Sequence, residues 1–285
     1  MGIGGFGVQG FYRSIFGGDR PGYSICFQSL TQSTLRIRRE QGLLIKLVIF
    51  DLDGTLVNAY PAVSRSVNYT LNSLGFASRS DTQIKRSVGS GDRNLMVHFV
   101  GEKLGDQALA IYRPHHVKAL KVKGAVKFLP GARGVLKFLK GRGYHSAIAS
   151  NRPTKFTRII LKELGALPFF DVVLCADKVD RPKPYPDILW AIAKRLSLDK
   201  SEVLYVGDMT IDVNCARRAG VRMVAVTTGS SSKKELKDLK PWRIIGKMNQ
   251  LKEIITGGVM SKRLRKGKLN WRSKKANHGA KPGKG

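Results

Sequence analysis

The sequence predicts an α/β fold in which helices wind doubly around a parallel sheet, with a small helical cap inserted after the first strand. Three observations support this. An apolar run at 47–50 does not alternate with polar residues, as expected of a central strand buried on both faces. Short apolar runs alternate with helical patterns after residue 129. A block with helical periodicity separates the first strand from that region.

The first strand leads directly into the motif Asp51-Leu-Asp53-Gly54-Thr55-Leu56. Because side chains alternate along a strand, Asp51 and Asp53 point to the same side. Two carboxylates this close repel each other unless one is protonated or a cation lies between them, and a hard ion such as Mg²⁺ meets that need. Gly54 permits a tight turn. For this motif alone, an Asp-rich turn after a strand is the alternative interpretation.

Residues 57–127 carry helical periodicity. A first helix, with Gly75 as its stop, is indicated by apolar residues at helical spacing: Ala62, Val63, Val67, Leu71 and Leu74. A second helix is predicted over 94–104 and a third over 107–118, with a flexible loop at 89–93. The block is therefore interpreted as a small helical cap.

The region after Leu129 alternates helices with strands, which predicts parallel strands joined by helical crossovers. Pro153 marks the start of one helix, and Gly165 and Gly220 mark the ends of two. The predicted strands are 144–149, 171–175, 203–206 and 223–226. The predicted helices are 135–139, one from Pro153 to Gly165, 188–196 and 211–219.

Polar residues follow four of the predicted strands: Asp51 and Asp53, Ser150 and Asn151, Lys183, and Asp208 and Asp212. Because the carboxyl ends of parallel strands meet at one edge of a sheet, these side chains are expected to converge. Each has a commonplace interpretation, such as a helix-capping hydroxyl for Ser150 or a carboxylate in the first turn of a helix for Asp212. One shared site accounts for all four more simply than four coincidences.

The order D-L-D-G-T-L, S-N, R-P-K-P and G-D-M-T-I-D resembles the four-motif pattern of the haloacid dehalogenase (HAD) superfamily. The helical insert after the first motif resembles the cap of its phosphoglycolate-phosphatase-like branch, and the resemblance covers about 45–250. It implies a Rossmann-like HAD core made of 43–56 and 128–256, with the cap at 57–127. Asn58 departs from the pattern, because relatives usually carry an acidic residue there.

The same resemblance implies the chemical roles of the aspartates. Asp51 would be the nucleophile that forms an aspartyl-phosphate. Asp53 would be the acid/base that protonates the leaving oxygen and then activates water. Mg²⁺ would be held by Asp51, the carbonyl of Asp53 and Asp208, with Asp212 supporting this metal site.

The resemblance also implies how the substrate is held. Ser150 and Lys183 would bind the phosphoryl oxygens. Three other residues are candidates for binding the substrate, and for the cap members of this set a surface or packing role is the alternative: Asn151, Thr55 and Arg93, with His98 beside it in the cap.

The sequence therefore predicts a Mg²⁺-dependent phosphatase that hydrolyses a small phosphorylated metabolite, with phosphoglycolate as the default substrate. A carboxylate nucleophile splits such a hydrolysis into two easier steps. A phosphomutase acting on a sugar phosphate is the alternative, since it would share the core motifs and differ in the cap. Dehalogenation is the least favoured activity, because it does not depend on an acid/base at Asp53.

The net charge of +31 is unevenly distributed. Residues 43–256 carry 36 basic and 18 acidic residues, whereas 257–285 carry ten basic residues and no acidic ones. Excess positive charge on the body favours anionic substrates. The tail, with Trp271, is of a kind that neutralises phosphates and stacks on a base. A nucleic-acid-binding or ribosome-associated protein that binds weakly through 260–285 is therefore the alternative of a different class, against a merely solvated tail.

The two ends of the chain are predicted to lie outside the fold. Residues 1–42 are rich in glycine and keep no regular period, so a disordered extension is expected. Their Arg-containing, acid-poor composition also matches an organelle transit peptide, although the glycines weaken an amphipathic helix. Residues 257–285 are predicted to be a disordered basic tail, and the change of composition at Met260 suggests a second short reading frame fused to the first.

The sequence also predicts where the protein works. No apolar run reaches the length of about 18 residues that a membrane span needs. The three cysteines (Cys26, Cys175 and Cys215) are far apart and lack metal-ligand spacing, which indicates a reducing compartment. A cytoplasmic location without membrane contact is therefore expected, and the sequence leaves the oligomeric state open.

Overall fold

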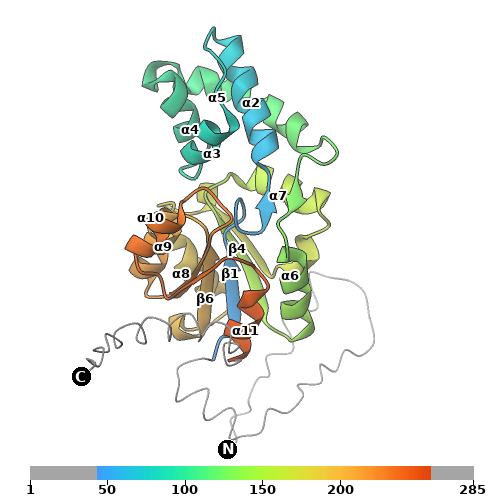
Figure 1. The fold of residues 1–285 in the computed structure, drawn as a ribbon, viewed down its shortest axis with the longest axis vertical. Helices are drawn as coiled ribbons and strands as arrows, with labels where there is room; N and C mark the ends of the chain where they lie inside the picture. The colour runs from blue at the N-terminus through green and yellow to red at the C-terminus, as the bar shows by residue number, and fades with distance from the viewer. Residues whose placement is uncertain (1–43, 258–285) are drawn as a thin grey trace, which may run out of the picture.

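The computed structural model describes residues 44–257, so the predictions for the N-terminal extension and for the tail from 258 onward lie outside the described residues (Figure 1). The centre of the fold is a six-stranded sheet with the order β5-β4-β1-β6-β7-β8, and every pair in it is parallel. The strands are β1 (Leu47–Phe50), β4 (His145–Ser150), β5 (Val172–Cys175), β6 (Val203–Gly207), β7 (Arg222–Val226) and β8 (Arg243–Ile245). This confirms the predicted doubly wound parallel sheet.

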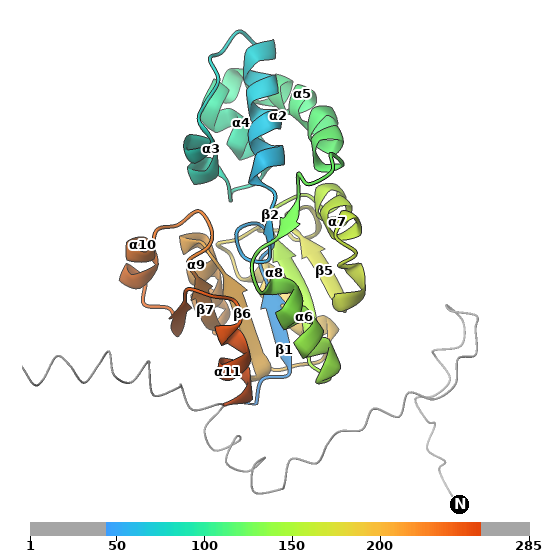
Figure 2. The ribbon, with the colours of Figure 1, turned by 45° about the vertical axis from the view of Figure 1, so that its right-hand side comes forward.

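Helices cover both faces of the sheet, which explains why the first strand does not alternate in polarity (Figures 1 and 2). Val48 and Phe50 pack with α6 (Ala132–Gly141), α7 (Thr154–Glu163) and α11 (Gln250–Thr256). Leu47 and Ile49 pack with α8 (Asp187–Arg195), α9 (Thr210–Ala219) and α10 (Lys233–Asp238) on the other face. All four side chains of β1 are fully buried. A strand in this position needs an apolar residue at every site. Three short 3₁₀ turns complete this region: η2 (Leu167–Phe169), η3 (Ala176–Lys178) and η4 (Lys200–Glu202).

Four helices form a separate layer above the edge where β1 ends, and they have their own apolar core (Figure 2). They are α2 (Tyr60–Ser73), α3 (Asp81–Ser87), α4 (Asp92–Val100) and α5 (Glu102–Leu120). The chain enters through β2 (Val57–Asn58) and returns through β3 (Lys127–Phe128), which pair antiparallel. The helical layer is thus connected to the core by a two-stranded antiparallel ribbon.

The helical layer differs from its prediction in two places. The helix expected over 94–104 is two helices, because Gly101 adopts a φ of 80° that ends α4 and starts α5. Helix α3 was not predicted, because Ile84 is its only buried residue and one apolar residue gives no periodicity. Its start is fixed instead by a capping box between Ser80 and Gln83.

The remaining predicted elements lie within a few residues of the observed ones, and one helix start is shifted. Five short elements were not predicted: β2, β3, β8, α10 and α11. Strand β8, for example, has three residues at a sheet edge, which is too short a pattern to recognise. Pro153 is the N-cap of α7 rather than its first helical residue. Within the described part of the chain, each helix is too short or too polar to span a bilayer.

Candidate active site

The turn after β1 brings two aspartates to the carboxyl edge of the sheet. The amide of Asp51 donates to the carbonyl of Val206 at 2.8 Å, which extends the pairing of β1 with β6 by one residue. Gly54 has a φ of 80°, and a Cβ at this position would lie 2.6 Å from the Tyr60 hydroxyl and 2.7 Å from Asp208 Oδ2. Only glycine satisfies both the backbone conformation and the close approach.

Asp208 follows β6 directly, so the strand order places it beside Asp51. Its Oδ1 accepts a hydrogen bond from the Thr55 hydroxyl at 2.9 Å, and its Oδ2 accepts one from the amide of Ser230 at 2.9 Å. A Cβ on Gly229 would overlap Asp208 Oδ2. Thr55 therefore orients a carboxylate, and its predicted role in binding substrate stays a prediction.

Asp212 lies one helical turn beyond Asp208, in the first turn of α9. Its Oδ1 accepts from the Tyr205 hydroxyl at 2.7 Å, and its Oδ2 accepts from the amide of Met209 at 3.0 Å. Both oxygens are thus engaged by the protein, which fixes the carboxylate rigidly.

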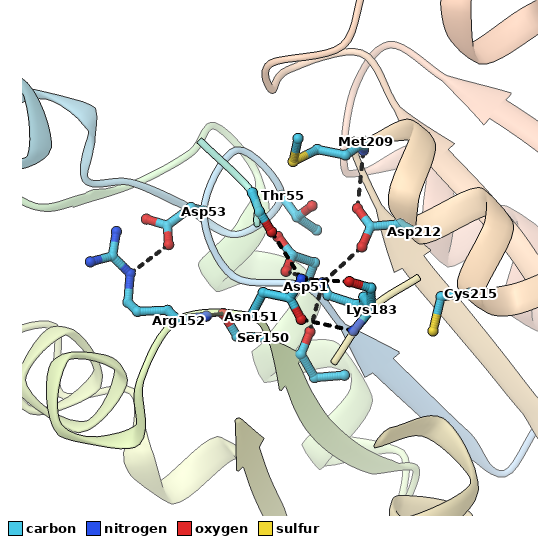
Figure 3. A network of polar contacts seen from close by, with 12 residues as sticks. Asp51, Asp53, Thr55, Ser150, Asn151, Arg152, Lys183, Met209, Asp212 and Cys215 are labelled. Carbon is cyan, nitrogen blue, oxygen red and sulfur yellow. Dashed lines mark hydrogen bonds and ion pairs between the residues drawn. The ribbon is translucent and has the colours of Figure 1, made fainter. Parts of the chain in front are cut away.

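Lys183 joins the clusters from different strands (Figure 3). Its buried ammonium has four oxygens within hydrogen-bond distance for its three N–H groups: Asp51 Oδ1 at 2.6 Å, Asp212 Oδ1 at 2.8 Å, the Tyr205 hydroxyl at 3.0 Å and the carbonyl of Ala149 at 3.1 Å. Burial lowers the pKa of Lys183, but the carboxylates of Asp212 and Asp51 raise it by more than burial lowers it. The net pKa of Lys183 therefore lies above its usual value. The side chain is therefore charged at neutral pH.

Asn151 holds the Lys183 loop rather than facing a ligand. Its Oδ1 accepts from the Lys183 amide at 3.0 Å, while its Nδ2 donates to the Lys183 carbonyl and to the carbonyl of Gly89, both at 2.9 Å. The whole amide group is used in these contacts. Asn151 lines the pocket and positions Lys183, and its predicted role in binding substrate stays a prediction.

Three buried carboxylates form a group suited to a metal ion. Oxygens of Asp51, Asp208 and Asp212 all lie within 4.8 Å of one another. Burial raises the pKa of Asp51 to about 7, although the charge of Lys183 lowers it, and burial raises the pKa of Asp208 well above its usual range. Desolvated like charges of this kind need a cation to remain ionised together. The donor set of hard oxygens fits Mg²⁺.

Asp53 lies on the other side of Asp51 and forms an ion pair that the sequence analysis missed. Arg152 Nε donates to Asp53 Oδ2 at 2.7 Å (Figure 3). The other oxygen, Asp53 Oδ1, is buried without a hydrogen-bond partner among the described residues. The only sequence signal for Arg152 was its place directly after Asn151. Ser150 Oγ accepts from the Arg152 amide at 3.2 Å and fixes this turn.

A buried histidine of the helical layer completes the contact with Arg152. His116, on α5, lies 2.7 Å from Arg152 Nη1 through its Nε2. Because a guanidinium can only donate, Nε2 accepts and the ring proton sits on Nδ1. That proton points to Ser66 Oγ at 3.1 Å, and the Ser66 hydroxyl donates to the carbonyl of Ala62 at 2.8 Å. A continuous series of hydrogen bonds thus links Asp53 to α2, with Arg152 donating in both directions.

These residues surround a pocket between the helical layer and the sheet, with a volume of about 70 Å³. The catalytic candidates in its wall are Asp51, Asp53, Ser150 and Lys183, and Arg152 lies beside them. Much of the remaining wall is apolar: Val63, Val88, Leu95, Phe156, Met209 and Ile211. Arg93 does not line it, because its side chain is 43% exposed and pairs with Glu102 and Asp106. His98 is exposed and packs against Phe99.

A family model of haloacid dehalogenase-like hydrolases matches residues 48–226. The chain belongs to this family. It is 32% identical over 219 residues to a phosphoglycolate phosphatase of Pseudomonas savastanoi pv. phaseolicola, which covers 74% of this chain and 79% of that protein. A phosphoglycolate phosphatase of Yersinia pseudotuberculosis is 30% identical over 190 residues, covering 65% of this chain and 82% of its own.

The fold of this haloacid dehalogenase-like hydrolase also matches solved structures. A predicted phosphoglycolate phosphatase from Haemophilus somnus superimposes with a TM-score of 0.69 at 25% identity, over 74% of this chain and 98% of that one. The sequence and structural relatives confirm the predicted family, its phosphoglycolate-phosphatase-like branch and the predicted class of enzyme, a phosphatase.

The position of Arg93 leads to a prediction about the HAD hydrolase. Replacing Arg93 by methionine is expected to leave kcat/KM within about twofold of wild type, because its partners Glu102 and Asp106 are exposed and surface ion pairs contribute little. Steady-state phosphate release on the best substrate measures this. A loss of more than about tenfold would place Arg93 back in substrate binding.

Burial of His116 leads to a prediction about stability and pH. Burial, and then the charge of Arg152, lowers the pKa of His116 from 6.5 to about 2. The unfolded chain therefore binds a proton below pH 6.5 that the folded protein does not, so stability falls as the pH falls. Between about pH 7.5 and about pH 5.5, the free energy of unfolding is expected to drop by about 1.4 kcal/mol more in wild type than in His116→Gln.

Urea unfolding of the two proteins at both pH values measures this difference. The comparison cancels the contributions of other titrating groups, since they are common to both proteins. An equal drop in wild type and variant would mean that the pKa of His116 is the same in the folded protein as in the unfolded chain.

Proposed function

We propose that this protein is a Mg²⁺-dependent phosphatase that hydrolyses a small phosphomonoester such as phosphoglycolate through an aspartyl-phosphate on Asp51. One observation carries this proposal. Asp51 lies at the carboxyl end of the central strand with Lys183 Nζ 2.6 Å away, Asp208 and Asp212 on one side and Asp53 on the other. A candidate nucleophile, a cation and a candidate acid/base thus line one pocket, and two further buried carboxylates lie beside the nucleophile.

In the first step, a carboxylate oxygen of Asp51 attacks phosphorus. The bond from phosphorus to the ester oxygen breaks, and Asp53 gives a proton to that oxygen so that a neutral alcohol leaves. Lys183 and Ser150, both in the pocket wall, hold phosphoryl oxygens in this step. Phosphoryl transfer depends mainly on such alignment and neutralisation of charge.

In the second step, water attacks the phosphorus of the aspartyl-phosphate. Asp53, now ionised, takes a proton from the water, and the bond from phosphorus to the Asp51 oxygen breaks. Inorganic phosphate leaves and Asp51 is restored as a carboxylate. The unpartnered oxygen Asp53 Oδ1 supports this role, because it is free to receive the proton while Oδ2 stays paired with Arg152.

The residues that would hold Mg²⁺ are Asp51, Asp208 and the carbonyl of Asp53, with Asp212 fixing Lys183 and completing the acidic group. The ion would neutralise charge on the transferring phosphoryl group. Thr55 and the amide of Ser230 keep Asp208 in place for this purpose.

Phosphate release from a panel of small phosphomonoesters, with Mg²⁺ and with EDTA, tests the proposal. We expect release that requires Mg²⁺ and is fastest for phosphoglycolate or a close analogue. Equal rates in Mg²⁺ and in EDTA would contradict the metal dependence. The absence of release from every ester by the folded protein would contradict the proposed hydrolysis.

A further inference from the structure

We propose that Arg152 selects the substrate by binding a carboxylate attached one carbon away from the ester oxygen. This inference rests on the proposed function and adds the residue that would distinguish a phosphorylated short hydroxy acid from the phosphate ester of a neutral alcohol. The inference is carried by one arrangement of side chains. The guanidinium of Arg152 is buried and held between Asp53 and His116 of the helical layer, and its Nη2 amino group is not used in these contacts.

The guanidinium of Arg152 is fixed on two of its three nitrogens. Nε donates to Asp53 Oδ2 and Nη1 donates to His116 Nε2, both at 2.7 Å. Nη2, which carries two N–H groups, makes no hydrogen bond to any other residue in 44–257. The side chain is 12% exposed and lines the pocket, so the free donors are open to a ligand there.

No other cationic group in the pocket wall is available for a second anion. Within the described residues, Lys183 and Arg152 are the two cationic side chains of that wall. Lys183 is buried against Asp51 and Asp212, where the phosphoryl group is expected. Asp92 also lies in the wall, and its partner Arg113, 2.8 Å away, is not among the residues that line the pocket.

The position of Arg152 sets how far the second anion lies from the ester oxygen. Asp53 must reach the ester oxygen to protonate it, and Arg152 is bonded directly to Asp53. A carboxylate one carbon from that oxygen would therefore lie beside the guanidinium. Without Arg152 the same carboxylate would face the charge of Asp53 and a wall that is largely apolar, at a high desolvation cost. Arginine suits this task because its planar donors match a carboxylate.

His116 is the positioning residue for Arg152. It is fully buried, and its ring stacks on Tyr112 with centroids 4.8 Å apart. Since Nε2 accepts from Nη1, the plane of the guanidinium is set by a residue of α5. Recognition of the carboxylate thus depends on the helical layer, although the residue that binds it belongs to the core.

The test compares kcat/KM for 2-phosphoglycolate with kcat/KM for ethyl phosphate, which has a methyl group in place of the carboxylate. Wild type is expected to prefer phosphoglycolate by about 10- to 100-fold, the range for a charge-assisted hydrogen bond. In Arg152→Met the preference should fall to within about threefold of unity. Arg152→Lys should restore part of it, and the matched control Arg93→Met should keep the full wild-type preference.

The ratio of the two esters separates recognition from a merely structural role, since damage to the fold or to Asp53 lowers both rates together. An equal loss on both esters in Arg152→Met, or no preference in wild type, would overturn the inference and leave the phosphatase standing. If wild type cleaves neither ester nor any other in the panel, the proposed function falls and this inference with it. Should Arg152→Met fail to fold, Arg152→Lys replaces it in the test. A preference for phosphoglycolate below that of wild type then supports the inference, and the full wild-type preference overturns it.

Discussion

Turnover is expected to fall by about 10⁴-fold or more when Asp51 is replaced by asparagine. An amide is a poor nucleophile toward phosphorus, so the first step of the proposed reaction has no substitute in this pocket. The replacement also removes one of the carboxylates that would hold Mg²⁺. The two losses act on the same step, which makes this the largest effect the account predicts.

The fold is expected to survive this replacement. Lys183 keeps Asp212, Tyr205 and the carbonyl of Ala149 as partners, so its charge stays paired. Circular dichroism and a thermal melt provide the control for folding, and phosphate release under saturating substrate measures the activity. Activity within about tenfold of wild type in a folded Asp51→Asn protein would contradict its role as nucleophile.

Replacing Lys183 by methionine is expected to cost about 3–5 kcal/mol of stability, because it leaves two buried carboxylates without their cation. The loss should be larger above pH 7 than below it, because burial raises the pKa of Asp51 to about 7 and its carboxylate ionises as the pH rises through that value. Turnover should also fall by about 10³-fold, since Lys183 is the one lysine among residues 44–257 that lines the pocket.

Urea unfolding at neutral pH measures the stability of this variant, and phosphate release measures its turnover. Lys178→Met is the matched control, because Lys178 is an exposed lysine in η3. This replacement should change the free energy of unfolding by no more than about 0.5 kcal/mol. If Lys183→Met were as stable as this control, the buried ion pairs would contribute nothing net to folding.

The strand ends were predictable because each combines an apolar run with polar residues directly after it. Asp51, Asp53 and Asp208 follow strands buried on both faces, and the topology of a parallel sheet is enough to bring them together. The same reasoning placed Ser150 and Lys183 at that edge. A local pattern sufficed for these residues, because the sheet converts sequence position into spatial position.

The residues that sequence analysis missed or misplaced depend on contacts made across the fold. Arg152 is defined by His116, which is 36 residues away and in the helical layer. Asn151 was expected to bind substrate, but its partners lie in the Lys183 loop and at Gly89. Arg93 was expected in a flexible loop over 89–93, yet it lies in the first turn of α4 and pairs with the carboxylates of Glu102 and Asp106 on α5. No spacing within a single segment encodes contacts of this kind.

Short elements escaped prediction for a different reason. β2 and β3 have two residues each and are held by pairing with each other rather than by a pattern of their own. The split between α4 and α5 depends on the left-handed backbone of Gly101, a residue that a helix also tolerates at modest cost. Neither feature changes the site, but both define how the helical layer sits on the core.

The covalent intermediate on Asp51 is tested most directly by rapid acid quench during turnover of phosphoglycolate, followed by mass spectrometry of peptides. The account predicts the mass of one phosphoryl group on the peptide that contains Asp51 in wild type, and none on that peptide in Asp51→Asn. Two results would contradict the account: a phosphoryl group on another residue, or a burst of product release during which no phosphorylated peptide is found.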